Sequence, residues 1–551
     1  MHTHSWLKGR LSRRAILAAG GASLGMSALT GRAFGDVDAQ TVATQYGQVR
    51  GDVERGVRVF RGLPYAGPVS GREQRFRAPT PPASWSGVRD ATQFGPQAIQ
   101  PVQGPGGEPS SEDCLFLNIW TPDAQSGSRP VMFYCHGGGF TVGSGAREYQ
   151  NGANLAREQD VVVVAVNHRL GVFGYLYLGG LLGDDYPANP GLLDLVAALD
   201  WVRSNIAAFG GDPENVTIFG ESGGGGKVSC LYAMPQAAPL FARASIESPI
   251  GPNDWSPEQA TDVAREAMRW FDLNDPAELL DLSAEQWLNF QNGGDNPLPP
   301  GSREPGEPPA NRDQWFWPVI DGQVLPEVPF KEHAPAISAN KPLIIGTNRD
   351  EAVFFHFGDP EAFSLDEAGL IARLTASHGS DAAAWLEAFR ASRPDATPSQ
   401  LLMAIETAMP WRAQAVHVAE AKAAEGQAPV YAYILDYHST DRFPGTEFEI
   451  GSPHASDIVM KFNNVGNPGM GSFFGNPTPP EQRLAAHNMS SLWGSFARQG
   501  VPTVEGQPQW RPYTLSGRET YLIDAACRLV SDPEAAERQF WQGQLETRGT
   551  P

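Results

Sequence analysis

Cysteine and positive charge are both scarce in this sequence, and each shortage excludes a class of protein. Only four cysteines occur among 551 residues, and they have no Cys-x-x-Cys spacing, so the sequence indicates neither a zinc site nor a disulfide framework. Lysine and arginine number 41 against 62 aspartate and glutamate residues, for a formal net charge of -21. Because nucleic-acid binding requires a basic surface, we expect no nucleic-acid partner. The cysteines, among which the sequence selects no pair, are Cys114, Cys135, Cys230 and Cys527.

The apolar stretch nearest the N-terminus is too short to span a bilayer comfortably. It covers residues 15–29, contains three glycines, and is followed by a small-residue cleavage pattern at residues 33–35. Arg13 and Arg14 directly precede it and resemble a bacterial twin-arginine export signal. We therefore expect residues 1–35 to be an export signal, with a periplasmic or secreted product and no stable membrane span.

The remaining chain predicts strands first and an α/β alternation later. Residues 41–65 combine turn glycines with short Val-rich runs, which is typical of antiparallel strands. From Pro130 onward, short apolar runs alternate with helical periodicity, as over residues 192–206. This alternation predicts a mostly parallel sheet covered by helices on both faces. The Pro- and Gly-rich residues 292–312 predict a long loop. The runs that predict buried strands are residues 131–134, 161–166, 216–219, 343–345 and 430–435.

A serine between a strand and a helix is the candidate nucleophile. Gly-Glu-Ser-Gly-Gly at residues 220–224 places Ser222 at a sharp turn, where small neighbours let the backbone pack closely. The pattern alone is weak, since residues 21–25 also satisfy it inside the predicted signal. The preceding strand and the helix that follows favour the second occurrence. Each helical glycine costs about 1 kcal/mol relative to alanine, so the glycine run at residues 223–226 favours a close approach of backbone to a ligand or a strand. A flexible surface turn is the alternative.

A second glycine-rich segment follows another predicted strand. His-Gly-Gly-Gly-Phe at residues 136–140 resembles the glycine loop of lipases and esterases. Ester hydrolysis places negative charge on the carbonyl oxygen, which fixed backbone N–H groups stabilise. We expect the N–H groups of Gly138, Gly139 and Gly223 to form that oxyanion hole. A plain glycine turn is the alternative.

Several further segments resemble the type-B carboxylesterase and cholinesterase family. Residues 209–224 are similar to the serine signature of that family, and residues 112–122 to its second signature. Residues 62–66 and 167–174 are also similar to family segments. The likeness runs from about residue 41 to residue 530. It implies an α/β-hydrolase fold and the hydrolysis of carboxylic esters.

The resemblance also implies the acid and the base, which follow the serine in the order acid, then histidine. Glu351 comes directly after a predicted strand and matches the acid segment of the family, while His454 matches its base. By chemistry alone, Asp350 and Glu221 are alternatives for the acid, and His438 for the base. We expect Glu221, which is next to the nucleophile, to point elsewhere.

The sequence departs from the family pattern at several positions. The family usually has alanine at position 223 and a small residue at position 227, where this chain has Gly223 and Lys227. A lysine on the nucleophile helix must find solvent or a partner. Exported relatives often have a cysteine near position 98 that pairs with the one at position 114, and this chain has Ala98 there. Residues 103–110 lack the tryptophan with which cholinesterases hold choline.

These observations together predict one large α/β-hydrolase domain over residues 36–551 that hydrolyses neutral short-to-medium-chain esters. The expected partner is a small-molecule ester, and no metal or organic cofactor is implied. The sequence does not indicate an oligomeric state. A binding protein that has lost activity is one alternative, and a lipase or amidase using the same groups is another.

Overall fold

The structure is a computed structural model that describes residues 40–101, 108–122, 128–251, 254–293, 315–466 and 478–548. The predicted export signal, residues 1–35, lies outside these ranges, as does most of the predicted loop at residues 292–312. Both stay predictions. Within the described ranges, no helix combines the length and the apolar character needed to cross a membrane.

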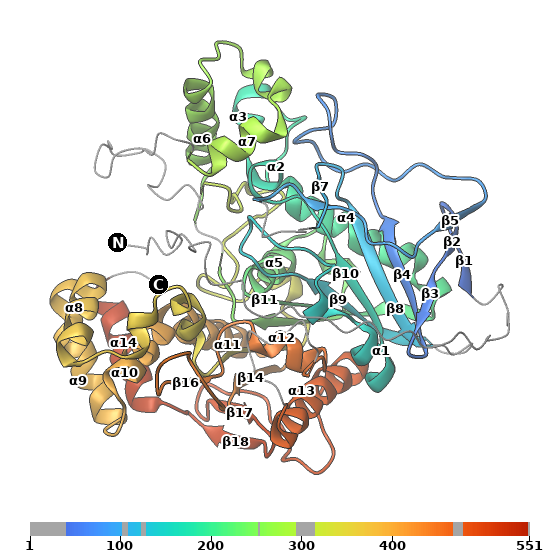
Figure 1. The fold of residues 1–551 in the computed structure, drawn as a ribbon. Helices are drawn as coiled ribbons and strands as arrows, with labels where there is room; N and C mark the ends of the chain where they lie inside the picture. Colours follow the sequence, from blue (N-terminus) through green and yellow to red (C-terminus); the bar gives the residue numbers. More distant parts are fainter. Residues whose placement is uncertain are drawn as a thin grey trace, which may run out of the picture.

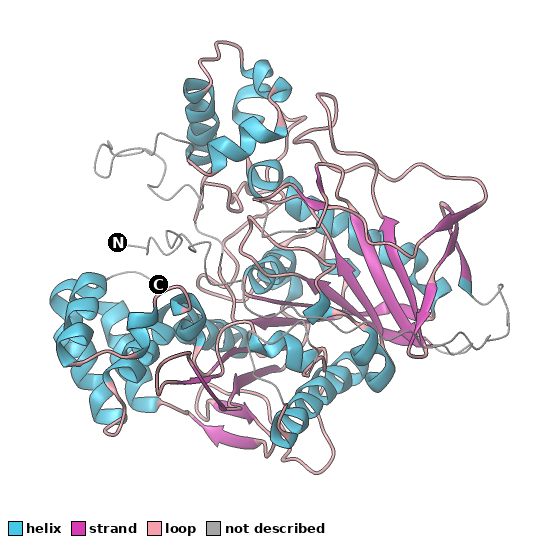
Figure 2. Cartoon of the chain, in the orientation of Figure 1, coloured by secondary structure: helices cyan, strands magenta, loops and turns pink. Residues whose placement is uncertain are grey.

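An 11-stranded sheet forms the centre of the described part of the chain, in the order β18-β17-β14-β13-β12-β11-β9-β10-β8-β4-β3 (Figures 1 and 2). The seven strands that lie between β17 and β10 in this order, both included, pair in parallel. The pairs β18-β17, β10-β8, β8-β4 and β4-β3 are antiparallel. The strands of this sheet are β3 (Asp52–Glu54), β4 (Val57–Pro64), β8 (Phe116–Pro122), β9 (Arg129–Cys135), β10 (Val162–Val166), β11 (Gly211–Glu221), β12 (Arg243–Glu247), β13 (Leu343–Asn348), β14 (Val430–Leu435), β17 (Glu519–Ile523) and β18 (Arg528–Ser531).

The smaller strands lie outside this sheet. They are β1 (Thr41–Thr44), β2 (Gly47–Arg50), β5 (Val88–Asp90), β6 (Gln97–Ala98), β7 (Ser110–Ser111), β15 (Ser439–Arg442) and β16 (Glu449–Gly451). The antiparallel pairing of β1 with β2 and of β3 with β4 confirms the prediction for residues 41–65.

Alternate residues of the central strands pack into two separate hydrophobic cores, because side chains alternate between the faces of a sheet. In β9, Val131, Phe133 and Cys135 enter one core, whereas Met132 and Tyr134 enter the other. Burial on both faces explains why these strands are continuously apolar in sequence.

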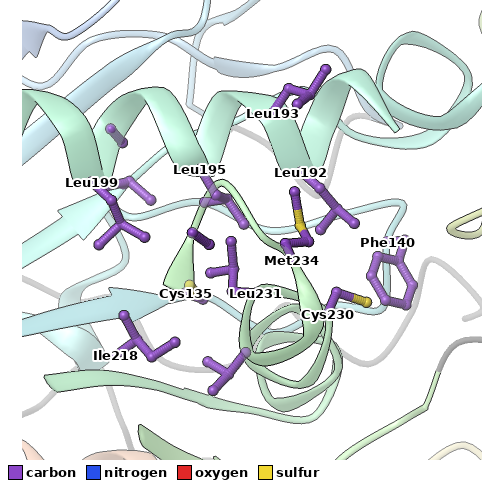
Figure 3. Close-up of a cluster of buried hydrophobic side chains, with 14 of the residues drawn as sticks. Cys135, Phe140, Leu192, Leu193, Leu195, Leu199, Ile218, Cys230, Leu231 and Met234 are labelled. Carbon is purple, nitrogen blue, oxygen red and sulfur yellow. The ribbon is translucent and has the colours of Figure 1, made fainter. Parts of the chain in front are cut away.

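Helices cover both faces, as the alternation predicts. Side chains of α4 (Pro190–Asn205), α5 (Gly223–Ala233) and α11 (Ala413–Glu425) belong to the first core, part of which Figure 3 shows. Those of α1 (Ala153–Gln159) and α13 (Pro480–Gln499) belong to the second. The other α-helices are α2 (Gly171–Tyr175), α3 (Gly179–Leu182), α6 (Pro257–Trp270), α7 (Ala284–Gln291), α8 (Glu367–His378), α9 (Ala382–Ser392), α10 (Pro398–Thr407), α12 (Ser456–Lys461) and α14 (Ala535–Arg548).

The parallel strands direct three candidate side chains to one edge of the sheet. Ser222 directly follows β11, Glu351 follows β13, and His454 lies in the connection that follows β14. In open α/β sheets, the loops at the carboxyl ends of the strands form the ligand site. The fold therefore positions the site at this edge.

Candidate active site

Ser222 occupies the sharp turn that the sequence predicts between β11 and α5. Its backbone has φ 58° and ψ -124°, a conformation that a non-glycine residue rarely adopts and that costs on the order of 1–3 kcal/mol. Its N–H donates to the carbonyl of Glu247 at 2.9 Å, and its own carbonyl accepts from Gly226 at 3.0 Å. These bonds hold the strained turn on both sides, and 6% of the residue is exposed.

The glycines after Ser222 lie against other backbone segments, which confirms the close approach predicted for residues 223–226. A Cβ at Gly223 would collide with Gly139, and one at Gly224 with the carbonyl of Cys135. Cβ atoms at the next two positions would meet the carbonyls of Glu247 and Ile250. The start of α5 is therefore free of side chains because no space exists for them.

The loop at residues 136–140 follows β9 and touches the start of α5. Gly138 has φ 89° and Gly139 has φ 60°, values that favour glycine. The N–H of Gly223, the first residue of α5, has no intrahelical partner because of its position. The three predicted oxyanion-hole residues are thus brought together, since Gly223 lies directly against Gly139.

His454 and Glu351 form a buried hydrogen-bonded pair. The Nδ1 atom of His454 lies 2.6 Å from Oε2 of Glu351. The other carboxylate oxygen, Oε1, accepts from the hydroxyl of Ser248 at 2.5 Å and from the N–H of Asn348 at 2.6 Å. Because the carboxylate is held on both oxygens, it fixes the orientation of the imidazole ring.

Glu221 lies beside this pair, so the expectation that it points elsewhere is wrong. Its Oε1 atom is 3.1 Å from Nε2 of His454, and the residue is 2% exposed. Alternation along β11 places Glu221 on the same face of the sheet as Phe219, which packs into the second core. Burial lowers the pKa of His454, but Glu221, Glu351 and Asp457 outweigh it and raise that pKa to about 9. Burial raises the pKa of Glu221.

The alternative acid and the alternative base make other contacts. Asp350 Oδ2 accepts from the N–H of Ser452 at 3.0 Å, so it supports the loop that precedes His454. Burial raises its pKa. The Nε2 atom of His438 lies 2.8 Å from Oε2 of Glu449, and 44% of the His438 side chain is exposed. Neither contact involves His454 or Ser222.

The comparison with known proteins decides the family. A model of the carboxylesterase family matches residues 38–541. The chain belongs to the carboxylesterase family. It is 36% identical to the para-nitrobenzyl esterase of Bacillus subtilis over 510 residues, which cover 91% of this chain and 98% of that protein. It is 33% identical to the phenmedipham hydrolase of Pseudarthrobacter oxydans over 505 residues, covering 90% and 95% of the two chains.

A solved structure supports the same assignment. The carboxylesterase of Geobacillus stearothermophilus aligns with a TM-score of 0.76 and 36% identity, over 91% of this chain and 100% of that one. These similarities confirm the α/β-hydrolase fold that the sequence predicts. The protein is a carboxylic ester hydrolase.

A charged network that the sequence did not reveal lies beneath the histidine of this esterase. Lys461 Nζ donates to Asp457 at 3.1 Å and also to Glu247, and all three residues are buried. The carboxylates of Asp457 and Glu247 overcome burial and raise the pKa of Lys461. Because Lys461 and Glu247 are far apart in the chain, no local pattern could have identified the pair. Asn348 links this network to Glu351 through Asp457 at 3.2 Å.

Lys227, which departs from the family pattern, is a buried partner of the glycine loop. Its Nζ atom donates to the carbonyl of His136 at 2.9 Å and to that of Gly139 at 2.8 Å. It also lies 5.5 Å from the centre of the Phe140 ring. Burial lowers the pKa of Lys227 to about 7.

Three aromatic side chains surround the ring of His454. The ring centroids of Phe355, Trp411 and Phe354 lie 5.1 Å, 5.6 Å and 5.9 Å from that of His454. Trp411 stacks on Phe355 at 5.0 Å and belongs to a π-helical turn, Ala408–Arg412. Such turns are frequent at functional sites. The rings form an apolar wall beside the candidate base.

The four cysteines are free and buried. Burial raises the pKa of the Cys135 thiol to about 12, and it raises those of the Cys114 and Cys230 thiols further. Thiols with raised pKa values are poor nucleophiles at neutral pH. They therefore do not compete chemically with Ser222.

Proposed function

We propose that this esterase acts through an acyl-enzyme, with Ser222 as nucleophile, His454 as general base and Glu351 as the acid of the triad. The observation that carries the proposal is the position of His454. Its Nδ1 atom is bound to Glu351, while its Nε2 atom faces Glu221, the residue next to Ser222. In a triad, a carboxylate holds Nδ1 and leaves Nε2 to take the serine proton, so the held Nδ1 and the nearness of the ring to the Ser222 turn support these roles.

The reaction then proceeds in two balanced halves. Ser222 Oγ attacks the ester carbonyl as its proton passes to Nε2 of His454, and the carbonyl oxygen takes up the negative charge. The N–H groups of Gly138, Gly139 and Gly223 stabilise that oxyanion. His454 returns the proton to the leaving alcohol, which gives the acyl-enzyme. Water repeats the sequence and releases the acid, with Glu351 stabilising the imidazolium in both halves.

A fluorophosphonate probe tests the nucleophile, because only an activated serine reacts with it. We expect labelling of Ser222 alone, and Ser222→Ala should lose both labelling and nearly all ester hydrolysis. His454→Ala should lower kcat by several powers of ten, whereas His438→Ala, with its exposed ring, should change it little. Labelling that persists in Ser222→Ala would refute the assignment.

We propose that the substrates are neutral esters of short to medium chain length. The rings of Phe354, Phe355 and Trp411 supply an apolar wall at His454, and the name of the Bacillus subtilis relative refers to an ester of a neutral aromatic alcohol. Quaternary ammonium groups require aromatic faces, and residues 103–110 provide none.

A panel of p-nitrophenyl esters of increasing acyl length tests this proposal, together with the matching p-nitroanilides. We expect a maximum of kcat/KM at short to medium length and slow turnover of the anilides. A neutral ester should also exceed its choline counterpart of equal acyl length in about 0.15 M salt, where long-range steering is screened. A tenfold preference for the choline ester would show that the wall at His454 binds cations.

A further inference from the structure

Two residues of α5 meet the glycine loop at the same point. Lys227 donates to the carbonyl oxygen of Gly139 at 2.8 Å. A Cβ placed on Gly223 would collide with that same oxygen and with the Cα atom of Gly139. Lys227 thus binds the loop, and Gly223 leaves space for it.

Lys227 is an unusual residue for this position. Its side chain is fully buried, and its two hydrogen-bond partners in the described chain are both backbone carbonyls of the loop. Burying an amine that has no carboxylate partner costs free energy, whether the amine is charged or neutral. Its presence therefore requires a compensating role, and the partners indicate the loop.

The hydrogen bonds of the loop fix four successive carbonyl groups. Lys227 Nζ binds those of His136 and Gly139. The Nδ1 atom of His136 lies 2.9 Å from the Gly137 carbonyl, and the N–H of Val142 donates to that of Gly138 at 3.1 Å. Because a trans peptide is planar, fixing a carbonyl fixes the N–H on its opposite side. The N–H groups of Gly138 and Gly139 are therefore oriented between two peptides that Lys227 holds.

We propose that Lys227 is a positioning residue of the oxyanion hole and that Gly223 is its necessary counterpart. Lys227 draws the loop against α5, so that the N–H groups of Gly138 and Gly139 converge with that of Gly223. The loop then lies too close to α5 for any side chain at position 223. This inference rests on the proposed acyl-enzyme function.

A double-mutant cycle tests the coupling between the two positions. The variants are K227S, G223A and K227S/G223A, with K227M as a second replacement of the lysine. The matched control is K422M, because Lys422 is also buried and also donates to a carbonyl, that of Ala339, on a contact outside the loop. For each variant, kcat and KM are measured with a p-nitrophenyl ester, and inhibition with a trifluoromethyl ketone, which forms a tetrahedral adduct.

We expect K227S and K227M to lower kcat by about 10-fold to 10²-fold with little change in KM, since complete loss of one oxyanion-hole donor costs about 10²–10³. The affinity for the ketone should fall in parallel, whereas that for the product alcohol should not. G223A should be severe when Lys227 is present and should cost less than about threefold further when K227S is already present, because the released loop then has space for the methyl group. K422M should retain the wild-type kcat.

Additive effects of G223A and K227S would overturn the proposal, as would K227 variants that match K422M. Failure of both K227S and K227M to fold while K422M folds would also overturn it, because the lysine would then serve stability. Thermal melting identifies that outcome. If the fluorophosphonate does not label Ser222 in the wild-type protein, the proposed function fails; if it does, these results concern Lys227 alone.

Discussion

Two buried lysines lie near the candidate site, and their surroundings are opposite. Lys461 binds the carboxylates of Glu247 and Asp457, and those charges raise its pKa. In the described part of the chain, the hydrogen bonds of Lys227 go to carbonyls of the glycine loop, and burial lowers its pKa to about 7. A buried amine keeps its charge where it hydrogen-bonds to carboxylates, as Lys461 does, and burial brings it close to neutrality where its hydrogen bonds go to backbone carbonyls, as those of Lys227 do.

The same contrast divides the site into two sides. The part of the site around His454 contains four charged residues, so interactions between charges set its pKa values. These residues are Glu221, Glu351, Asp457 and Lys461. The side of the glycine loop contains oriented peptide groups and one amine close to neutrality. Substitutions on the first side are therefore expected to alter proton affinity and stability, and those on the second to alter geometry.

The largest effect should come from the carboxylate that holds His454. Glu351→Gln should lower kcat by about 10³–10⁴, as removal of a triad acid charge does elsewhere. Steady-state kinetics with a p-nitrophenyl ester measure it. Asp350→Asn is the matched control, since Asp350 bonds to the N–H of Ser452 instead of to the histidine. A greater loss of kcat in Asp350→Asn than in Glu351→Gln would show that Glu351 is not the acid of the triad.

The next effect concerns stability. Lys461→Met leaves Glu247 and Asp457 buried without their cation, and breaking such a pair costs about 3–5 kcal/mol. Lys227→Met removes hydrogen bonds but leaves no charge unpaired, so it should cost about 1–3 kcal/mol. The free energies of unfolding in guanidinium chloride compare the two variants. If both variants lost the same free energy of unfolding, the surroundings of the two lysines would make no difference to stability.

The smallest effect is a shift in pH dependence. The pKa of His454 is raised to about 9 because neighbouring carboxylates outweigh burial, and only the neutral imidazole acts as a base. Activity should therefore rise with pH through this pKa. Glu221→Gln removes one of the carboxylates and should lower the pKa of His454, so the acidic limb of kcat/KM should move to lower pH by about one unit or more. An unchanged limb, or a shift to higher pH, would contradict this account.

Most of the central strands could be predicted from the sequence because each of them is a short, continuous run of apolar residues. Burial on both faces makes β9, β10 and β14 continuously apolar, and such runs are visible without a structure. The strand β12 (Arg243–Glu247) was not predicted, since it is short and ends in the charged Glu247, whose partner is Lys461.

Within the site, the sequence located residues but could not orient them. The family resemblance identified Ser222, Glu351 and His454, yet Glu221 was expected to point elsewhere. Its contact with Nε2 of His454 joins residues that are far apart in the chain, which a strand pattern does not encode. The carbonyl partners of Lys227 were equally hidden, because hydrogen bonds across 91 and 88 residues leave no local signal.

The collisions at residues 223–226 have a consequence for laboratory evolution of this enzyme. Backbone of neighbouring segments occupies the space where side chains would begin at all four positions. A library that randomises this stretch would consist almost entirely of inactive members. Diversity in substrate choice has to be sought where side chains, and not backbone, form the wall. The histidine is surrounded by the side-chain rings of Phe354, Phe355 and Trp411. A small library that varies these three positions is the better route to new substrate specificities.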